Sequence, residues 1–152
     1  MAFGSRKSKP ITITVESFGE KTEVQLRPLS ALEQDQIERA LPQPTAPRIE
    51  VDGKPVANYA DPVYVEARTE WAVRMQLIRL CRMLGAEQFG TDEIDKQVTL
   101  LQAEFTVHEL SQLILAAQQI AKGNDPAAHA EAAKERLTPF EKSSTPPTAP
   151  EA

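Results

Sequence analysis

The sequence predicts an α+β protein in which an N-terminal β-hairpin packs on a mostly helical domain of three to five helices. Two segments near the N-terminus alternate apolar and polar residues with the period of a strand, whereas later segments carry apolar residues at helical spacing. Twelve prolines gather mainly in an internal loop and near the C-terminus. Because proline interrupts helices and central strands, these clusters mark segments outside the packed core.

The length of 152 residues suits a single domain. The expected order is a flexible basic N-terminus (1–9), one α+β domain (10–123), a region that can form an Ala-rich helix (124–137) and a disordered Pro-rich tail (138–152). Within the domain we expect a hairpin over 11–27, helices over 30–41, 62–84, 92–104 and 107–122, and a Pro-rich loop over 42–60.

The expected hairpin joins two alternating segments, residues 11–15 and 22–27, through a turn that contains Gly19. The first segment is β-branched throughout, which favours a strand. A lone hairpin is only marginally stable in water, so its apolar face must pack on the helices.

Helix starts are marked by capping residues. Ser30 with Glu33, and Thr106 with Glu109, have the spacing of a capping box. Asp61 precedes Pro62, which predicts an N-cap followed by proline at the first helical position.

The Pro-rich loop contains Asp52-Gly53 between two short apolar pairs, which predicts a minor hairpin. Pro55 restricts that hairpin to an edge or an exposed flap, because proline donates no backbone hydrogen bond.

The helix expected over 62–84 has an unusually wide apolar arc. After Trp71, apolar side chains cover well over half of its circumference, interrupted by arginines. An arc of this width indicates a helix that is central to its own fold or partly committed to a partner. We therefore expect a partner-binding face formed by Trp71, Met75, Ile78, Arg74, Arg79 and Arg82. The alternative is that these residues form the core of the helical part.

Composition and motifs argue against several classes of protein. The net charge of −5 disfavours nucleic-acid binding, which needs a basic face. No apolar run approaches the ~20 residues of a membrane-spanning helix, and the N-terminus lacks the apolar segment of a secretory signal.

Residues typical of catalysis or metal binding are sparse. The single Cys81 excludes an internal disulfide, and neither His108 nor His129 has a partner at ligand spacing. There is no Gly-rich phosphate loop, nucleophile elbow or zinc-binding helix motif. We therefore expect no catalytic residues, no cofactor and no metal, and Cys81 is expected to be a buried, inert thiol.

The order of several motifs resembles the tail assembly chaperones of long-tailed, siphovirus-like bacteriophages. After the short hairpin and capped helix come a Pro-rich stretch (40–47), Asp-Gly-Lys (52–54) and Asn-Tyr-Ala-Asp-Pro-Val-Tyr (58–64), followed by a long helix. The resemblance covers about residues 10 to 90 and rests on the order and spacing of these motifs.

The resemblance implies a non-enzymatic role in the cytoplasm of an infected bacterial host. Such chaperones bind the long, apolar tape-measure protein while tail-tube subunits polymerise around it, and they are generally absent from the mature virion. The family often has a second, frameshift-extended form. Self-association into a homo-oligomer is left open.

A second hypothesis is a structural tail or connector subunit that self-associates in the virion. Such a subunit is expected to form rings by adding strands at its hairpin edges. A chaperone is expected to stay small and to bind its client.

Overall fold

The computed structural model describes residues 9–128 and confirms the α+β fold class, with a two-stranded hairpin followed by helices. Residues 1–8 of the expected flexible N-terminus, most of the expected Ala-rich helix and the whole expected tail lie outside the described residues.

The chain begins with two antiparallel strands, β1 (Ile11–Ser17) and β2 (Glu20–Leu26), and the helix α1 (Ala31–Ala40). A second antiparallel hairpin follows, made of β3 (Arg48–Val51) and β4 (Lys54–Ala57). The chain then forms the long helix α2 (Pro62–Leu84), the short 3-10 helix η1 (Ala86–Gln88), α3 (Ile94–Glu104) and α4 (Val107–Ala121).

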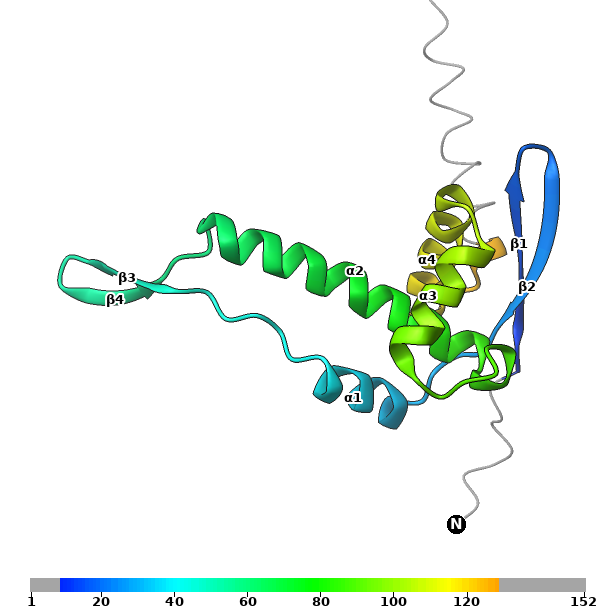
Figure 1. Ribbon diagram of the computed structural model, residues 1–152, viewed down its shortest axis with the longest axis horizontal. Coiled ribbons are helices and arrows are strands. Elements are labelled where there is room, and N and C mark those ends of the chain that lie inside the picture. Colours follow the sequence, from blue (N-terminus) through cyan, green and yellow to red (C-terminus); the bar gives the residue numbers. More distant parts are fainter. Residues whose placement is uncertain (1–8, 129–152) are drawn as a thin grey trace, which may run out of the picture.

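The elements form a body from which one long extension projects (Figure 1). The body holds the β1–β2 hairpin, α3, α4 and the C-terminal half of α2. The N-terminal half of α2 leaves the body, and the β3–β4 hairpin lies beyond its far end. We call residues 48–73 the arm: this hairpin, the turn that follows it and the first half of α2.

The core lies where the C-terminal half of α2 passes between its neighbours. The long helix contacts α1, α3, α4 and β2, and α4 also packs on β1. The fully buried large side chains come from all these layers except α1, and they are Val15, Leu26, Leu80, Cys81, Leu101 and Leu113. The arm contributes only Tyr64 to the buried apolar residues, so the core belongs to the body.

The expected caps are present. In α1 the Glu33 amide donates to Ser30 Oγ at 3.2 Å, and in α4 the Glu109 amide donates to Thr106 Oγ1 at 3.2 Å. The Asp61 carboxylate accepts from the Tyr64 amide at 3.0 Å, with Pro62 as the first residue of α2. These contacts satisfy amide groups that have no partner within a helix.

The third helix begins later than the sequence predicts. It starts at Ile94 instead of residue 92, and its N-cap Glu93 makes no side-chain capping bond. Thr91 explains the difference, because its hydroxyl accepts from the Glu93 amide at 3.2 Å and its carbonyl accepts from Gln97 Nε2 at 2.7 Å. These bonds hold residues 91–93 in a turn.

Both hairpins close through two residues with positive φ. Asp52 and Gly53 have φ of 53° and 76°, and Phe18 and Gly19 have φ of 53° and 80°. Positive φ at both central positions is the geometry of a type I′ turn, which matches the twist of the strands. The minor hairpin expected around Asp52-Gly53 is therefore present.

Candidate binding surface

Two of the residues expected to face a partner are enclosed in the body. Met75 and Ile78 are 6% and 7% exposed and belong to the core, so the prediction that they present an apolar face is wrong. The wide apolar arc has another cause: α1, α3, α4 and β2 all contact this one helix. A helix surrounded on several sides needs apolar residues around most of its circumference.

Trp71 lies at the boundary between the arm and the body. Its ring is half-buried against the core, and its indole Nε1 donates to the Leu41 carbonyl at 2.9 Å. Leu41 is the C-cap of α1, so this bond satisfies a helix-end carbonyl. Trp71 therefore joins α1 to α2 at the place where the arm begins.

The three arginines expected at the partner face hold α2 to its neighbours or lie beside them. Arg74 forms an ion pair with Asp95 near the start of α3. Arg79 Nε donates to Gln34 Oε1 of α1 at 3.1 Å. Arg82 shares with Arg74 and Ile78 the lining of a cavity of about 410 Å³ between α1, α2 and the start of α3. The structure thus brings Arg74, Arg82 and Ile78 together, but as part of the contact between helices.

The arm exposes a set of apolar side chains different from those expected at the partner face. They come from the hairpin, the turn after it and the outer side of α2: Ile49, Val51, Val56, Tyr59, Val63, Val65 and Val73. The alternation of Ile49 and Val51 is a signal in the sequence that could have indicated one apolar face. Val65 and Val73 of α2 stand two helical turns apart, a spacing that suits an exposed face as well as a core-facing one.

A shallow depression of about 420 Å³ lies on the arm, and we call it the arm depression. It is lined by Tyr59, Tyr64, Val65, Arg68, Thr69, Ala72, Val73 and Gln76. The rings of Tyr59 and Tyr64 pack in a tilted arrangement with centroids 5.9 Å apart. Tyr64 is buried, whereas Tyr59 is 66% exposed, so the buried ring supports the exposed one. An exposed aromatic residue beside valines is typical of a protein-binding surface.

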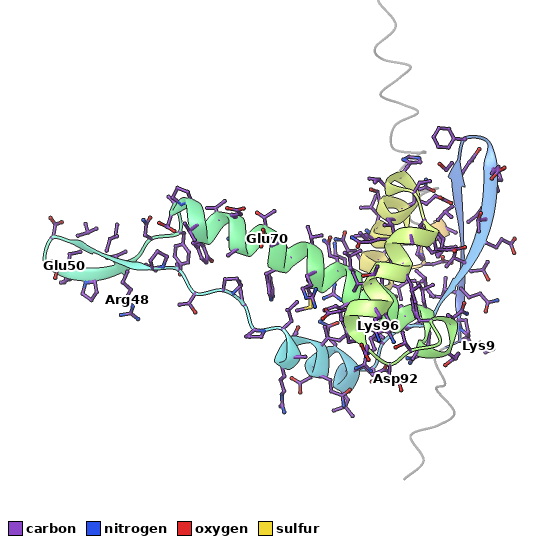
Figure 2. All side chains as sticks on the ribbon, in the orientation of Figure 1. Lys9, Arg48, Glu50, Glu70, Asp92 and Lys96 are labelled. Carbon is purple, nitrogen blue, oxygen red and sulfur yellow. The ribbon has the colours of Figure 1, made fainter. Side chains whose placement is uncertain are left out.

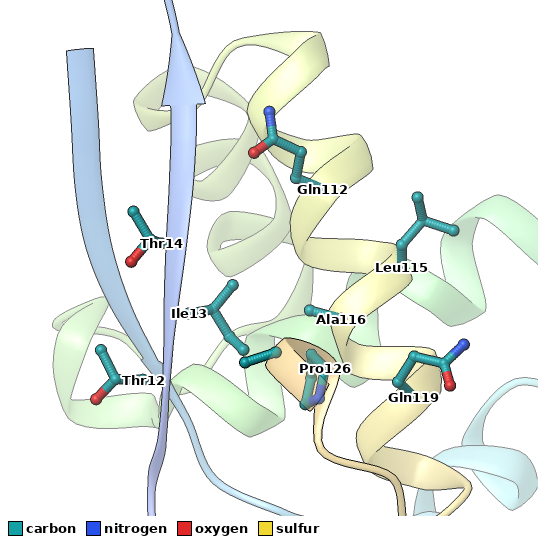
Figure 3. Close-up of a pocket in the computed structure, with 9 residues that line it drawn as sticks. Thr12, Ile13, Thr14, Gln112, Leu115, Ala116, Gln119 and Pro126 are labelled. Atoms are coloured by element: carbon teal, nitrogen blue, oxygen red, sulfur yellow. The ribbon is translucent and has the colours of Figure 1, made fainter. Parts of the chain in front are cut away.

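A second groove, of about 530 Å³, runs between β1 and α4 (Figure 3). Thr12, Ile13 and Thr14 line one side, and Leu115 and Gln119 are among the residues of α4 on the other. One end of the strand edge is already paired. Gln112 donates from Nε2 to the Glu16 carbonyl at 2.8 Å and accepts from the Glu16 amide at 3.0 Å, as a neighbouring strand would.

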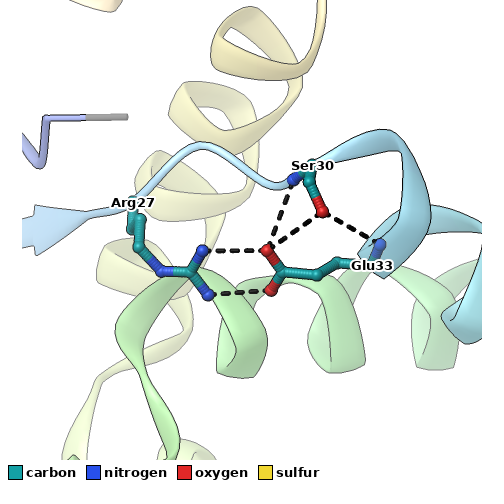
Figure 4. Close-up of polar contacts among 3 residues, drawn as sticks. All are labelled: Arg27, Ser30 and Glu33. Carbon is teal, nitrogen blue, oxygen red and sulfur yellow. Dashed lines mark hydrogen bonds and ion pairs between the residues drawn. The ribbon is translucent and has the colours of Figure 1, made fainter. Parts of the chain in front are cut away.

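A bidentate ion pair joins the end of β2 to the start of α1 (Figure 4). Arg27 donates two hydrogen bonds to the Glu33 carboxylate, at 2.9 and 2.8 Å. This pairing, with hydrogen bonds from Ser30, lowers the pKa of Glu33 to about 2. Burial raises the pKa of the Cys81 thiol to about 11.

Among residues 9–128, no three His, Cys, Asp or Glu side chains gather as they would around a metal ion. Over the same residues, no helix is long and apolar enough to cross a membrane. Comparisons of the chain with protein-family models, curated proteins and solved structures find no match.

Proposed function

We propose that this chain is a phage tail assembly chaperone that binds the tape-measure protein and assists tail-tube assembly without catalysing a reaction. The observation that carries the proposal is the arm, which holds an exposed apolar surface outside the body. A client on that surface is bound without disturbing the core. Such a protein acts in the cytoplasm of the infected host and is released before the virion is complete.

The location of the motifs that resemble the chaperone family supports the proposal. Asp-Gly-Lys (52–54) forms the turn of the β3–β4 hairpin and the first residue of β4. The segment 58–64 forms the turn and the start of α2, including Tyr59 and Tyr64 of the arm depression. The resemblance therefore concentrates on the same part of the molecule as the exposed apolar residues.

One side of the arm depression is a row of side chains against which a helical client can pack. Val65, Thr69 and Val73 follow one another at a spacing of four along α2, which makes a ridge on one side of the helix. Ridges of this kind pack into the grooves of another helix. The tape-measure protein of the family is long and helical, so the client offers such grooves.

The experiment is co-expression with a phage tape-measure protein as the client, followed by affinity capture. Val65→Asp and Val73→Asp place charges in the arm depression, where both side chains are exposed in the free protein. Because both positions are exposed, we expect the thermal melt to change little. Capture of the client should fall by at least about tenfold, as for loss of a contact worth ~1.4 kcal/mol or more.

Val107→Asp is the matched control. Val107 is an exposed valine at the start of α4, outside the arm depression, and the change is chemically identical. This variant should capture the client as well as the natural protein does. Equal capture by all three variants, with the client kept soluble, would contradict the proposed binding surface.

A further inference from the structure

The β3–β4 hairpin is an isolated ribbon with one apolar face. Ile49 lies opposite Val56, and Val51 follows two residues after Ile49, so the three side chains share a face. All three are exposed, and none of the residues in the two strands is buried. A two-stranded hairpin of this length is marginally stable in water. Its stability therefore benefits from further strand pairing.

The direction of the backbone groups in β3 follows from the ladder. The Asn58 amide donates to the Pro47 carbonyl at 2.7 Å, one step beyond the pair of Arg48 with Ala57. Hydrogen-bonded pairs alternate along an antiparallel ladder. Ile49 and Val51 consequently direct their amide and carbonyl groups toward β4, and Arg48 and Glu50 direct theirs outward. The outer edge of β3 thus presents two donors and two acceptors.

The outer edge of β4 differs from that of β3. Pro55 lies opposite Glu50, so its nitrogen also faces outward, and it has no proton to donate. Proline at such a position blocks strand addition. The ribbon therefore has one open edge, along β3, and one blocked edge, along β4.

We propose that a second copy of this chain pairs with the open edge of β3. The pairing is antiparallel and centred on Ile49, which places Arg48 of each copy opposite Glu50 of the other. Both residues of these pairs direct their backbone groups outward, so the register forms four backbone hydrogen bonds. It also sets opposite charges across the interface, an arrangement that stabilises strand pairs. Figure 2 shows Arg48 and Glu50 on the ribbon, at the end of the molecule remote from Asp92 and Lys96.

Charge selects this register over its neighbours. A register centred on Arg48 sets arginine opposite arginine. One centred on Glu50 sets glutamate opposite glutamate in the strands and brings Arg48 opposite Asp52 only in the turn. A register centred on Val51 sets Glu50 opposite Asp52, and these two side chains also carry like charges. Like charges directly opposite destabilise a strand pair. The register centred on Ile49 is the one among these that pairs opposite charges within the strands, because Asp52 lies in the turn, beyond the end of β3.

The product is a closed dimer. The interface uses the same edge of both copies and leaves the blocked edges outside, so it does not propagate. It forms a four-stranded sheet that carries Ile49, Val51 and Val56 of both copies on one face. This inference goes beyond the proposed function, because it concerns the chain without its client.

The test is sedimentation equilibrium of the full chain in the absence of client. We expect a concentration-dependent dimer of twice the 16.8 kDa chain mass. Arg48→Glu and Glu50→Arg each turn two attractive pairs into two repulsive ones, so each should weaken dimerisation by at least about tenfold. A mixture of the two variants should restore a dimer, because all pairs between unlike copies become attractive. The double variant R48E/E50R should also dimerise.

Lys21→Glu provides the matched control, since Lys21 is an exposed charge on the other hairpin. This variant should dimerise normally. The proposal is wrong if the natural protein is monomeric or grows into rings. It is also wrong if either single variant still dimerises, or if the Lys21→Glu control does not. The client is absent from this experiment. Its result and the result of the client-capture experiment can therefore fail separately.

Discussion

Glu33 combines two roles at the start of α1. Its carboxylate accepts from the Ser30 amide in the capping box and pairs with both terminal nitrogens of Arg27 (Figure 4). The pairing lowers the pKa of Glu33 from 4.5 to about 2. A carboxylate with a lowered pKa in the folded state stabilises the protein above its unfolded pKa, and that stabilisation is lost as pH falls from about 4.5 toward 2.

The first prediction concerns this pair. Glu33→Gln keeps a side chain that can complete the capping box but removes the charge. Because both partners are partly exposed to solvent, we expect a loss of only ~1 kcal/mol in the free energy of unfolding at pH 7. Near pH 2 the variant and the natural protein should differ much less. Urea denaturation at both pH values measures the difference in free energy of unfolding between the variant and the natural protein. An equal difference at pH 7 and pH 2 would show that the Glu33 charge does not provide the stabilisation.

Trp71 has a structural role at the base of the arm. Trp71→Phe retains an aromatic ring but leaves the Leu41 carbonyl without its donor, which should cost ~1 kcal/mol of stability. Trp71→Ala also removes packing, and for a half-buried ring we expect ~2–3 kcal/mol. Chemical denaturation measures both losses. Client capture by the folded Phe variant should be unchanged, since Trp71 does not line the arm depression, and impaired capture would restore Trp71 as a contact residue.

At the scale of elements, α2 consists of two parts with different environments. The first part, in the arm, buries only Tyr64, whereas residues 75–83 include six buried side chains, Met75, Leu77, Ile78, Leu80, Cys81 and Met83. Helical stability in proteins comes mainly from tertiary packing of the apolar face. The capped but weakly packed first half should therefore open more often than the second.

Amide hydrogen exchange tests this difference. Amides in residues 66–72 should exchange faster than those in residues 76–84, because local opening needs less free energy where few side chains are buried. Mass spectrometry of peptides from the two halves provides the measurement. Binding of the client should slow exchange in the first half and leave the second half unchanged. Uniform protection along the free helix would show that the arm is held by contacts other than those described.

At the scale of the whole molecule, the body carries the core and the arm carries the exposed apolar surface. The chain runs from α1 out to the arm and returns to the body along α2, and the β3–β4 hairpin lies farthest from the β1–β2 hairpin (Figure 1). This separation predicts that the hairpin can be removed without unfolding the body.

The hydrogen bond at the base of the β3–β4 hairpin shows where the hairpin can be cut out. Because the Pro47 carbonyl and the Asn58 amide are 2.7 Å apart, a short glycine linker can replace residues 48–57. The melting temperature should change by no more than a few degrees, since none of these residues is buried. Dimerisation should be lost. A cooperative unfolding transition far below that of the natural protein would show that the body depends on the hairpin.

Local signals in the sequence predicted the elements well. The pairs Ser30–Glu33 and Thr106–Glu109 form the expected capping boxes, and Asp61-Pro62 starts α2 where expected. These features depend on residues three or four positions apart, so the sequence contains them completely. The start of α3 was less accurate, because Thr91 bonds backbone and side-chain groups in a way that competes with a helical cap.

What the sequence by itself determined about this protein is its fold class, the starts of α1, α2 and α4 and the minor hairpin around Asp52-Gly53, because each depends on local chemistry. Only the tertiary structure decided which part of the apolar arc of α2 is exposed. Several elements enclose Met75 and Ile78, whereas Val65 and Val73 stay in solvent. Both halves of the helix have apolar residues at helical spacing, and such a pattern does not reveal how many neighbours surround a helix.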